Sequence, residues 1–296
     1  MGVIYLMIGV LMSGIYGFGL GPVNRRCKSM AELELFNACF AGVAMIGAMV
    51  SALTSGSMAI PFTGLLISLF WGTFFSLCVF FNLAALEEGP LSLTWLIVNF
   101  SLIMPLIYSF GFLGEPVTLL RVVGIVLLVI CMLLFTNPKV TGEKKISGKW
   151  LFYTLASMFC NGGLSLVAKI YAMKTDNVYA SPFLAYSYMF AAIVSLLISL
   201  ILRSRMDKES RYQPKAFFSP VMLLLILLIG GANFGLNLVV VILATLMDGA
   251  IVYPVIQGGG PIISSIASRL FLGEKIPPKK AAAILLGVAA IVILNL

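Results

Sequence analysis

Ten long apolar runs make up most of this chain of 296 residues. Each run is long enough to cross the hydrocarbon layer of a membrane, which takes about 20 residues in an α-helix. Lipid offers no hydrogen-bond partner to an open sheet edge, so every run is predicted to be a helix. The chain is therefore predicted to be an all-α integral membrane protein with ten transmembrane helices. The runs fall at roughly 2–21, 32–54, 62–86, 90–113, 116–136, 149–171, 179–203, 217–246, 248–272 and 277–295.

The composition excludes a soluble domain. Only 10% of the residues are charged, whereas soluble domains average about 25%. The net charge of +8 belongs to short loops between the runs, so it is a topology signal and predicts no nucleic-acid partner. The five cysteines lie apart and the chain has no histidine, so neither a metal site nor a cofactor is predicted.

The sequence repeats itself once. The tetrapeptide F-L-G-E occurs at 112–115 and again at 271–274. The two halves meet in the polar segment 137–145, which gives a first repeat at 1–137 and a second at 138–296. Each repeat holds five spans, and an odd number of spans forces the second repeat to insert upside down. We therefore predict two inverted five-helix repeats, an architecture that recurs in secondary transporters.

The basic residues predict the orientation in the membrane. Sixteen of the 19 lysines and arginines lie nearest to loops that follow odd-numbered runs. The positive-inside rule places these loops in the cytoplasm. We expect a multi-pass protein of the cell membrane with both termini on the same side, which the charge bias suggests is outside.

The ninth run contains the least ordinary stretch, from Tyr253 to Pro261. It holds Gln257, two prolines and three consecutive glycines, which are poor filler for a plain membrane anchor. Irregular backbone at membrane depth is tolerated only when it is buried in protein or lines a wet cavity. One interpretation is a bent or unwound helix that lines a central solute pathway. The alternative is a glycine-rich contact between closely packed helices, and both can hold. The candidate substrate-binding residues here are Tyr253, Gln257, Gly258, Gly259 and Gly260.

Five further side chains are candidates for substrate contact. Trp95 and Asn99 lie one turn apart in the fourth run, where an aromatic ring and an amide form a plausible platform for a small polar solute. Asn161 lies in the middle of the sixth run, and Asn233 and Asn237 share a helical face in the eighth. The alternative for each amide is a hydrogen bond that ties two helices together. For the pair in the eighth run we favour this packing role.

The charged residues near span ends are expected to be structural. Lys169 lies close to the end of the sixth run, where a lysine can reach the interface, so we favour anchoring over a role as substrate counter-ion. Glu115 and Glu274 follow a glycine, and each is expected to begin the next helix and to stabilise its N-terminus. Pro116 fits the first helical position of that helix.

No carboxylate is expected at mid-membrane, because every acidic residue falls at a span end or in a loop. A proton-coupled exporter of cationic drugs usually needs a carboxylate there, to pair with the cation and to titrate. This disfavours such an exporter relative to a carrier of neutral, zwitterionic or anionic solutes.

The chain resembles the drug/metabolite transporter superfamily, and in particular its ten-span EamA-like members. The resemblance covers essentially the whole chain and rests on the five-plus-five spans, the two F-L-G-E signatures and the stretch from Asn161-Gly162-Gly163 to Lys169. It implies a carrier that moves small metabolites through a central cavity by alternating access. The chain departs from the family pattern at 54–61, a linker that is often basic in these proteins and is uncharged here.

We therefore expect a secondary transporter of a small polar metabolite, such as an amino acid or related compound, that works by efflux or exchange. A proton-coupled multidrug or cation exporter is the alternative. A third hypothesis is a membrane-embedded enzyme acting on lipid-linked substrates. Because the chain has no histidine that could act as a base, we expect no enzyme. The expected partners are the solute and the lipid bilayer, and small-residue faces such as Ala38-xxx-Gly42 would support a homodimer.

Overall fold

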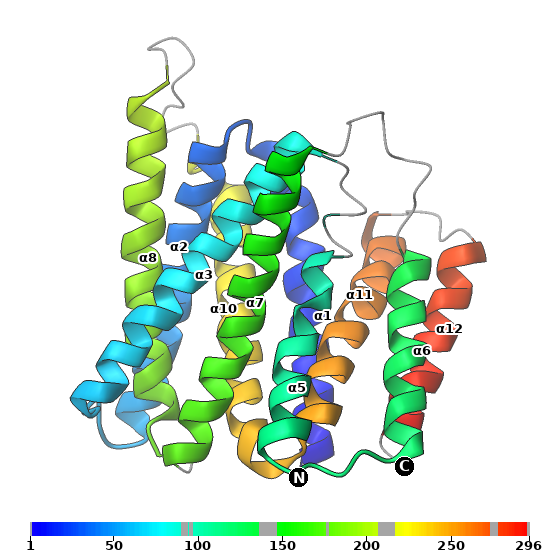
Figure 1. The fold of residues 1–296 in the computed structure, drawn as a ribbon. Coiled ribbons are helices and arrows are strands. Elements are labelled where there is room, and N and C mark those ends of the chain that lie inside the picture. Colours follow the sequence, from blue (N-terminus) through cyan, green and yellow to red (C-terminus); the bar gives the residue numbers. More distant parts are fainter. Residues whose placement is uncertain are drawn as a thin grey trace.

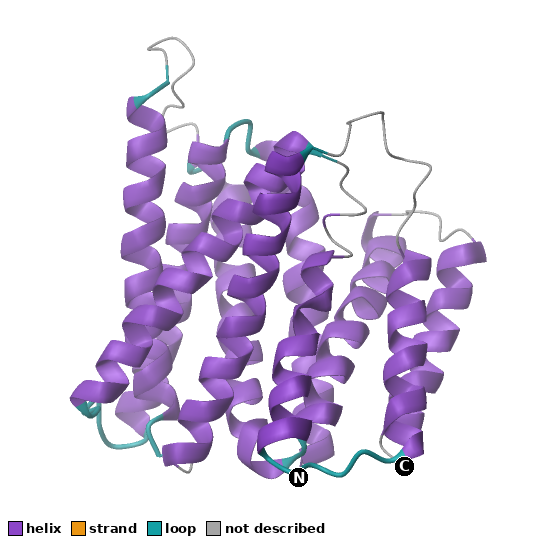
Figure 2. Cartoon of the chain, viewed as in Figure 1, coloured by secondary structure: helices purple, strands orange, loops and turns teal. Residues whose placement is uncertain are grey.

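In the computed structural model the described residues are 2–89, 94, 97–135, 147–175, 178–206, 217–272 and 278–294. Within these ranges the chain is helical apart from short turns and loops, and no strand occurs (Figure 2). The prediction of an all-helical protein is thus confirmed for the part of the chain that is described.

Seven helices are long and apolar enough to cross a membrane, judged by length and composition. Three shorter apolar helical segments lie within the fourth, fifth and tenth predicted spans. The fourth span contains a short 3₁₀ turn, η1, directly before α5. The long helices are α1 (Gly2–Arg26), α2 (Met30–Thr54), α3 (Phe62–Glu88), α7 (Gly148–Thr175), α8 (Ala180–Ser204), α10 (Pro220–Leu246) and α11 (Gly249–Leu272), and the shorter elements are η1 (Phe100–Leu102), α5 (Ile103–Phe112), α6 (Leu119–Phe135) and α12 (Pro278–Leu294).

The outer surface of the bundle is apolar, as expected for contact with lipid tails. Large side chains such as Phe70, Phe112 and Leu119 are exposed by 60%, 77% and 80%. A soluble protein of this size rarely leaves so many large apolar groups in water. Together with the length of the helices, this surface identifies a multi-pass membrane protein.

The helices form a bundle in which α1, α10 and α11 lie behind α5, α6 and α7, and helices that follow each other in the chain alternate in direction (Figure 1). α2 packs along α8, α3 along α7 and α8, α1 along α10 and α11, and α6 along α12. The N- and C-terminal ends of the chain lie at the same end of the bundle (Figure 1). This end also carries the loops between α2 and α3 and between α5 and α6.

Glycines bring several of these helices into backbone contact. A Cβ on Gly72 of α3 would lie 2.4 Å from the carbonyl oxygen of Ser187 and 2.8 Å from the nitrogen of Ala191, both on α8. A Cβ on Gly230 of α10 would lie 2.7 Å from the carbonyl oxygen of Phe40 on α2. Next to Gly72, the hydroxyl of Ser76 donates to the carbonyl of Ala191 at 2.9 Å. Small residues at interfaces of this kind allow close helix packing in lipid.

The stretch at Gly258, Gly259 and Gly260 is packed in the same way. α11 is a continuous helix through this stretch and through both of its prolines, so the expectation of an unwound segment is wrong. Cβ atoms at the three glycines would meet Leu128 of α6 at 2.5 Å, Val10 of α1 at 2.7 Å and Ser13 of α1 at 2.2 Å. The glycines therefore form the close helix contact that was the alternative interpretation.

Irregular backbone occurs instead in the fourth span. The 3₁₀ turn at Phe100–Leu102 interrupts the helical segment that runs to Phe112. Short 3₁₀ stretches inside a helix often mark a hinge or a functional position. The fourth span, not the ninth, thus carries the local departure from α-helical geometry.

We predict that Gly72→Ala destabilises the protein by about 1–3 kcal/mol, because the new methyl group meets backbone atoms that cannot move aside. Gly42→Ala on α2 is the matched control, because no atom lies within 4 Å of its Cβ position. This control should leave stability unchanged or raise it slightly, since alanine favours the helix. Thermal unfolding of both variants in detergent measures the difference, and equal melting temperatures would contradict the proposed contact.

Candidate functional site

One face of α7 carries a line of polar residues four positions apart. Asn161, Ser165 and Lys169 lie on successive turns, because residues at i and i+4 are neighbours on a helix surface. Each of them contacts a residue of the fourth span or of α11. We call this set, together with its partners, the α7 polar column.

Asn161 begins the column. Its side-chain nitrogen donates to the hydroxyl of Ser101 at 2.8 Å. Ser101 lies inside the 3₁₀ turn and is fully buried. Asn99 precedes this turn and is half-buried, whereas Trp95 lies outside the described residues. The predicted amides of the fourth and sixth spans are therefore on neighbouring elements at the irregular point of the bundle.

The middle of the column faces α11. The hydroxyl of Tyr253 donates to the carbonyl of Ser165 at 3.1 Å. Gln257 lies one turn further along α11, and its Oε1 atom is buried with no hydrogen-bond partner among the described residues. Pro261 has no N–H to donate to the backbone carbonyl of Gln257, four residues earlier. Gln257 therefore offers acceptor capacity that neighbouring protein groups do not use.

Lys169 ends the column in a buried ion pair. Its side chain is 1% exposed, so the expectation that it reaches the membrane interface is wrong. Its Nζ donates to the hydroxyl of Ser109 at 2.7 Å and to Oε1 of Glu115 at 2.6 Å. The same carboxylate accepts the backbone N–H groups of Gly249 and Ala250, each at 3.0 Å. Glu115 thus joins a buried cation to the N-terminus of α11.

The assignment of Glu115 to its own following helix is also wrong. α6 begins only at Leu119, so neither Glu115 nor Pro116 occupies its first turn. The carboxylate still stabilises a helix N-terminus, where free N–H groups and the positive end of the dipole favour an anion, but that helix is α11. Gly114 has a φ of +65°, which favours glycine and turns the chain at the end of α5. The second signature glutamate, Glu274, lies outside the described residues.

Gly249 makes room for the lysine. A Cβ at this position would lie 2.2 Å from Nζ of Lys169 and 2.5 Å from the hydroxyl oxygen of Ser109. The bare backbone lets the ammonium group approach the start of α11. A second ion pair, between Arg121 and Asp248 at 2.5 Å, holds the loop before α11 against the start of α6.

The environment of Glu115 favours its ionised form. Burial alone would raise the pKa of this carboxyl group. The hydrogen bond from Lys169, the backbone hydrogen bonds from Ala250 and Gly249 and the charge of Lys169 outweigh that effect, so the pKa lies below its usual range. The carboxylate that joins α5, α7 and α11 at this corner is therefore ionised at neutral pH.

Asn233 and Asn237 belong to a separate network on α10. The hydroxyl of Tyr188 on α8 donates to Oδ1 of Asn233 at 2.6 Å, and Nδ2 of Asn237 donates to the Tyr188 oxygen at 2.9 Å. The ring of Tyr188 stands edge-on to Trp71 and Phe75 of α3. The amides here tie α8 to α10, which agrees with the packing role favoured from the sequence.

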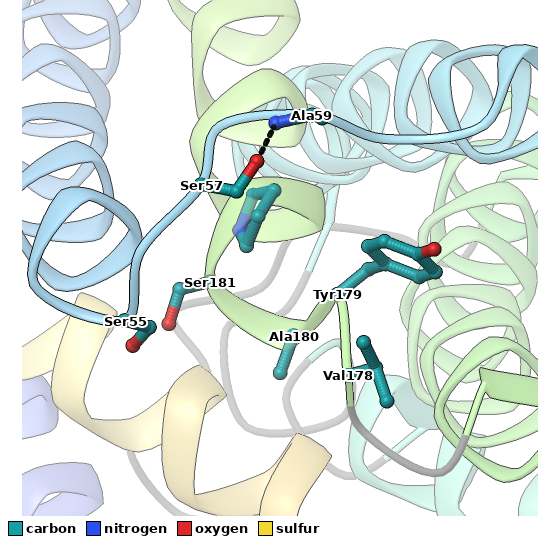
Figure 3. A pocket seen from close by; sticks show the side chains of 8 residues that line it. Ser55, Ser57, Ala59, Val178, Tyr179, Ala180 and Ser181 are labelled. Atoms are coloured by element: carbon teal, nitrogen blue, oxygen red, sulfur yellow. Dashed lines mark hydrogen bonds between the residues drawn. The ribbon is translucent and has the colours of Figure 1, made fainter.

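A surface pocket of about 280 Å³ opens elsewhere, at the end of the bundle (Figure 3). The α2–α3 loop and the start of α8 form its walls, and the hydroxyl of Ser57 accepts the backbone N–H of Ala59 inside it. It contains no charged side chain and none of the residues predicted to bind substrate. Its lining residues are Ser55, Ser57, Ala59, Val178, Tyr179, Ala180, Ser181 and Pro182.

Sequence reasoning missed three members of the column: Ser101, Ser109 and Glu115. A signal for the serines existed, because Ser101 and Ser109 recur at helical spacing on one face of the fourth span. No local signal links Glu115 to Lys169, because the two residues lie on different elements and meet only through packing.

Known proteins share the sequence pattern of the second half of this chain and its overall fold. A sequence model of the EamA-like transporter family matches residues 148–296. A crystal structure described only as "Crystal structure of protein" is similar over 98% of this chain and 95% of its own chain, with a TM-score of 0.76 and 14% sequence identity. At this identity the likeness concerns the fold alone. A search of curated proteins finds no match.

We predict that Lys169→Met destabilises the protein by about 3–5 kcal/mol, because it leaves the buried Glu115 carboxylate without its cation. The double variant Lys169→Met, Glu115→Gln should be more stable than Lys169→Met alone, since it removes the unpaired charge. Thermal unfolding of the single and double variants measures the coupling. Strictly additive effects would show that the two side chains do not depend on each other.

The pH dependence of stability provides an independent check. The pKa of Glu115 is lower in the folded protein than in the unfolded chain, where it is about 4.3. The ionised carboxylate therefore stabilises the fold above that pH, and this stabilisation is lost as the pH falls through the folded pKa. The difference in melting temperature between wild type and Glu115→Gln should therefore shrink below about pH 4. A difference that stays constant down to pH 2 would exclude this ionisation as its source.

Proposed function

The chain belongs to the EamA-like transporter family, and from this premise we propose that it is a secondary transporter of a small polar metabolite. The solute is an amino acid or related compound that leaves the cell, or is exchanged, by alternating access through the middle of the bundle. The observation that carries this proposal is a fully buried lysine at the end of a partly buried polar column that runs along α7.

The proposed architecture is ten spans in two inverted repeats, 1–137 and 138–296. In these repeats α1 corresponds to α7, α2 to α8 and α3 to α10. Support comes from matching contacts: the α3–α7 contact corresponds to the α10–α1 contact, and the α3–α8 contact corresponds to the α10–α2 contact. α2 packs on α8, and α6 packs on α12, so each of these helices contacts the corresponding helix of the other repeat. The family match at 148–296 falls within the second repeat.

Single glycine contacts agree with the same symmetry. A Cβ on Gly14 of α1 would meet Ile263 of α11 at 2.3 Å, and one on Gly162 of α7 would meet Met104 of α5 at 2.4 Å. Met104 and Ile263 stand at the same distance before the two F-L-G-E signatures. An inverted repeat predicts such matched pairs, whereas two unrelated halves do not.

The solute path follows the α7 polar column and the residues beside it. Asn99, Asn161, Tyr253 and Gln257 supply polar groups in its walls, and Trp95 is included from its place in the fourth span. The glycines at 258–260 let α11 lie against α1 and α6, which allows these helices to slide past each other. Asn233 and Asn237 hold the adjoining α8–α10 wall.

The charges along the path favour a solute that carries a carboxylate. Lys169 is a buried cation that an anionic group can approach. The free acceptor oxygen of Gln257 suits an ammonium or other donor. Both features together select zwitterionic or anionic metabolites over purely cationic drugs, for which the column provides no unpaired carboxylate among the described residues.

Exchange of carboxylates at Lys169 provides a mechanism for gating. In this conformation Glu115 occupies the lysine and also caps α11. A solute carboxylate that replaces Glu115 frees the α5–α6 loop and the start of α11, and so opens this end of the bundle. Departure of the solute restores the internal ion pair and closes it. A ligand shifts such an equilibrium only through its different affinity for the two states.

The orientation follows the charge bias. Both ends of the chain lie at one end of the bundle, and the loop between α5 and α6, which contains Glu115, lies at the same end (Figure 1). Among the described residues, Arg25 and Arg26 at the end of α1 and Lys149 at the start of α7 lie at the opposite end, which the positive-inside rule places in the cytoplasm. The ion pair then closes the outer side of a cell-membrane protein.

A thermal-shift screen of the purified protein tests this function. The ligands tested are amino acids, nucleosides, sugars and organic cations. We expect only the amino acids to raise the melting temperature. A ligand at 100 times its Kd stabilises the folded state by about 2.7 kcal/mol. Gln257→Ala and Asn99→Ala should lose this shift while remaining folded.

Asn237→Ala is the matched control, because it removes an amide of the separate α8–α10 network and should keep the ligand shift. A ligand that stabilises all variants equally would place binding outside the column. Stabilisation by organic cations alone would favour a cation exporter instead. Counterflow of the identified solute in proteoliposomes then establishes transport.

A further inference from the structure

A second buried carboxyl group lies on α2, far in sequence from the ion pair at Lys169. Glu34 is 0% exposed, although it lies near the start of α2, at the span end where it was expected. Its neighbours on the buried face of α2 are mainly alanines, which let α2 pack closely along α8. A glutamate in such an interface is costly, because a buried charge needs a partner.

The hydrogen bonds around Glu34 do not support its ionised form. Its Oε2 accepts one long hydrogen bond, from Nδ2 of Asn37 at 3.5 Å, and its Oε1 is buried without a partner among the described residues. Nδ2 of Asn37 is closer to Ser195 of α8, at 2.7 Å. The hydroxyl of Ser195 in turn donates to Ser76 of α3 at 2.8 Å, and Ser76 donates to the carbonyl of Ala191. Ser195 also lies within reach of the Glu34 carboxyl group, but its hydroxyl has one hydrogen, which it donates to Ser76 in this arrangement.

A proton on Glu34 would satisfy the remaining acceptors. Oδ1 of Asn37 is buried and unpartnered within the described part of the chain, and it belongs to the side chain next to Glu34. A protonated carboxyl group gains one donor, which can be given to this oxygen. A single hydrogen atom on Glu34, donated to Asn37, then accounts for both unpartnered oxygens, Oε1 of Glu34 and Oδ1 of Asn37.

No described cation compensates a charge on Glu34. The ion pairs of Arg121, Lys149 and Lys169 do not include it. On α8 the facing side chains are Ser195 and Ser199, and Ser199 donates to the carbonyl of Ala31 at 2.6 Å. Arg203 lies about two turns beyond Ser195, at the end of α8.

The other packed elements add no charge. The thiol of Cys78 on α3 is directed to α7, where it contacts the carbonyl of Ser157 at 3.6 Å. On α10, Gly230 packs against Phe40 and Val43 of α2, and the buried residues just before it, Ile226 and Ile229, are apolar. On α2 itself, Glu32 accepts the backbone N–H of Lys28 at 2.6 Å, in the first turn.

We propose that Glu34 and Asn37 form a proton-binding site between α2, α3 and α8, and that Glu34 carries its proton in this conformation. Release of the proton requires water to reach the carboxylate, and hence separation of α2 from α8. Proton binding is thereby linked to closure of this interface. Resting on the proposed transport function, this link makes the proton the coupling ion.

Infrared spectroscopy of the full-length protein in detergent tests the site without a solute. The carbonyl stretch of a protonated carboxylic acid is separate from that of a carboxylate. We expect wild type to show this band at neutral pH, Glu34→Gln to lose it, and the matched control Glu115→Gln to retain it. An unchanged band in Glu34→Gln, or no band in wild type, would overturn the proposal.

Asn37→Ala provides a second readout, because alanine suits the surrounding interface. It removes the acceptor of the Glu34 proton, so the band should shift toward the frequency of a non-hydrogen-bonded acid. A band that does not move would show that the proton is not given to Asn37 and would overturn the proposed pairing.

Proteoliposomes test the coupling with the solute identified in the thermal-shift screen. An imposed pH gradient should drive accumulation by wild type, whereas Glu34→Gln should keep exchange and lose gradient-driven accumulation. Exchange by wild type that ignores the pH gradient would overturn the coupling and leave the transport function standing. Accumulation driven by a sodium gradient, and lost in Glu34→Gln, would overturn the proton in favour of sodium. Absence of any transport would contradict the proposed function, while the infrared result still decides the proton site.

Discussion

The corner at Glu115 holds three parts of the bundle together. One carboxylate accepts hydrogen bonds from Lys169 of α7 and from the first two N–H groups of α11, and it belongs to the loop between α5 and α6. A buried ion pair by itself repays its desolvation cost only with good geometry and further hydrogen bonds. The helix N-terminus supplies these bonds, and Gly249 supplies the space. Removal of any one part leaves a buried charge or a bare helix end.

Two glutamates of this chain show how environment sets the role of a carboxyl group. Glu115 has a cation and two backbone donors, which lower its pKa and keep it charged. Glu34 is buried more completely and has one long hydrogen bond. The first group suits a latch that a solute carboxylate can replace, and the second suits a site that binds and releases a proton. In the proposed transport cycle, both carboxyl groups lie between helices that separate when access alternates.

Much of the fold was predictable from the sequence, because lipid imposes helices on apolar runs of this length. The described helices follow the predicted runs within a few residues. The packing role of Asn233 and Asn237 was also predictable, since two amides on one helical face are costly against lipid. Glycines in α11 were recognised as special, and they make the close contacts of one alternative.

The errors share a physical cause, which is that the partner of a polar group lies far away in the sequence. Lys169 looks like an interfacial lysine until α11 and Glu115 are placed beside it. Glu34 looks like a residue of a helix end until α8 covers it. The 3₁₀ turn at Ser101 lies four residues before Pro105, which has no N–H to donate to the Ser101 carbonyl, whereas α11 contains two prolines and stays helical. Local sequence reports the tendency of a segment, and tertiary contacts decide its final state.

The central claim is that the α7 polar column becomes accessible to water from alternate sides of the membrane. Ser165→Cys, in a protein whose five native cysteines are replaced, places a thiol in the middle of this column. Its modification by a membrane-impermeant thiol reagent is measured from each side of oriented vesicles. We predict that modification occurs, that its rate differs between the two sides, and that the transported solute slows it. A thiol that stays unmodified from both sides, with and without solute, would show that the column is sealed packing and would contradict the claim.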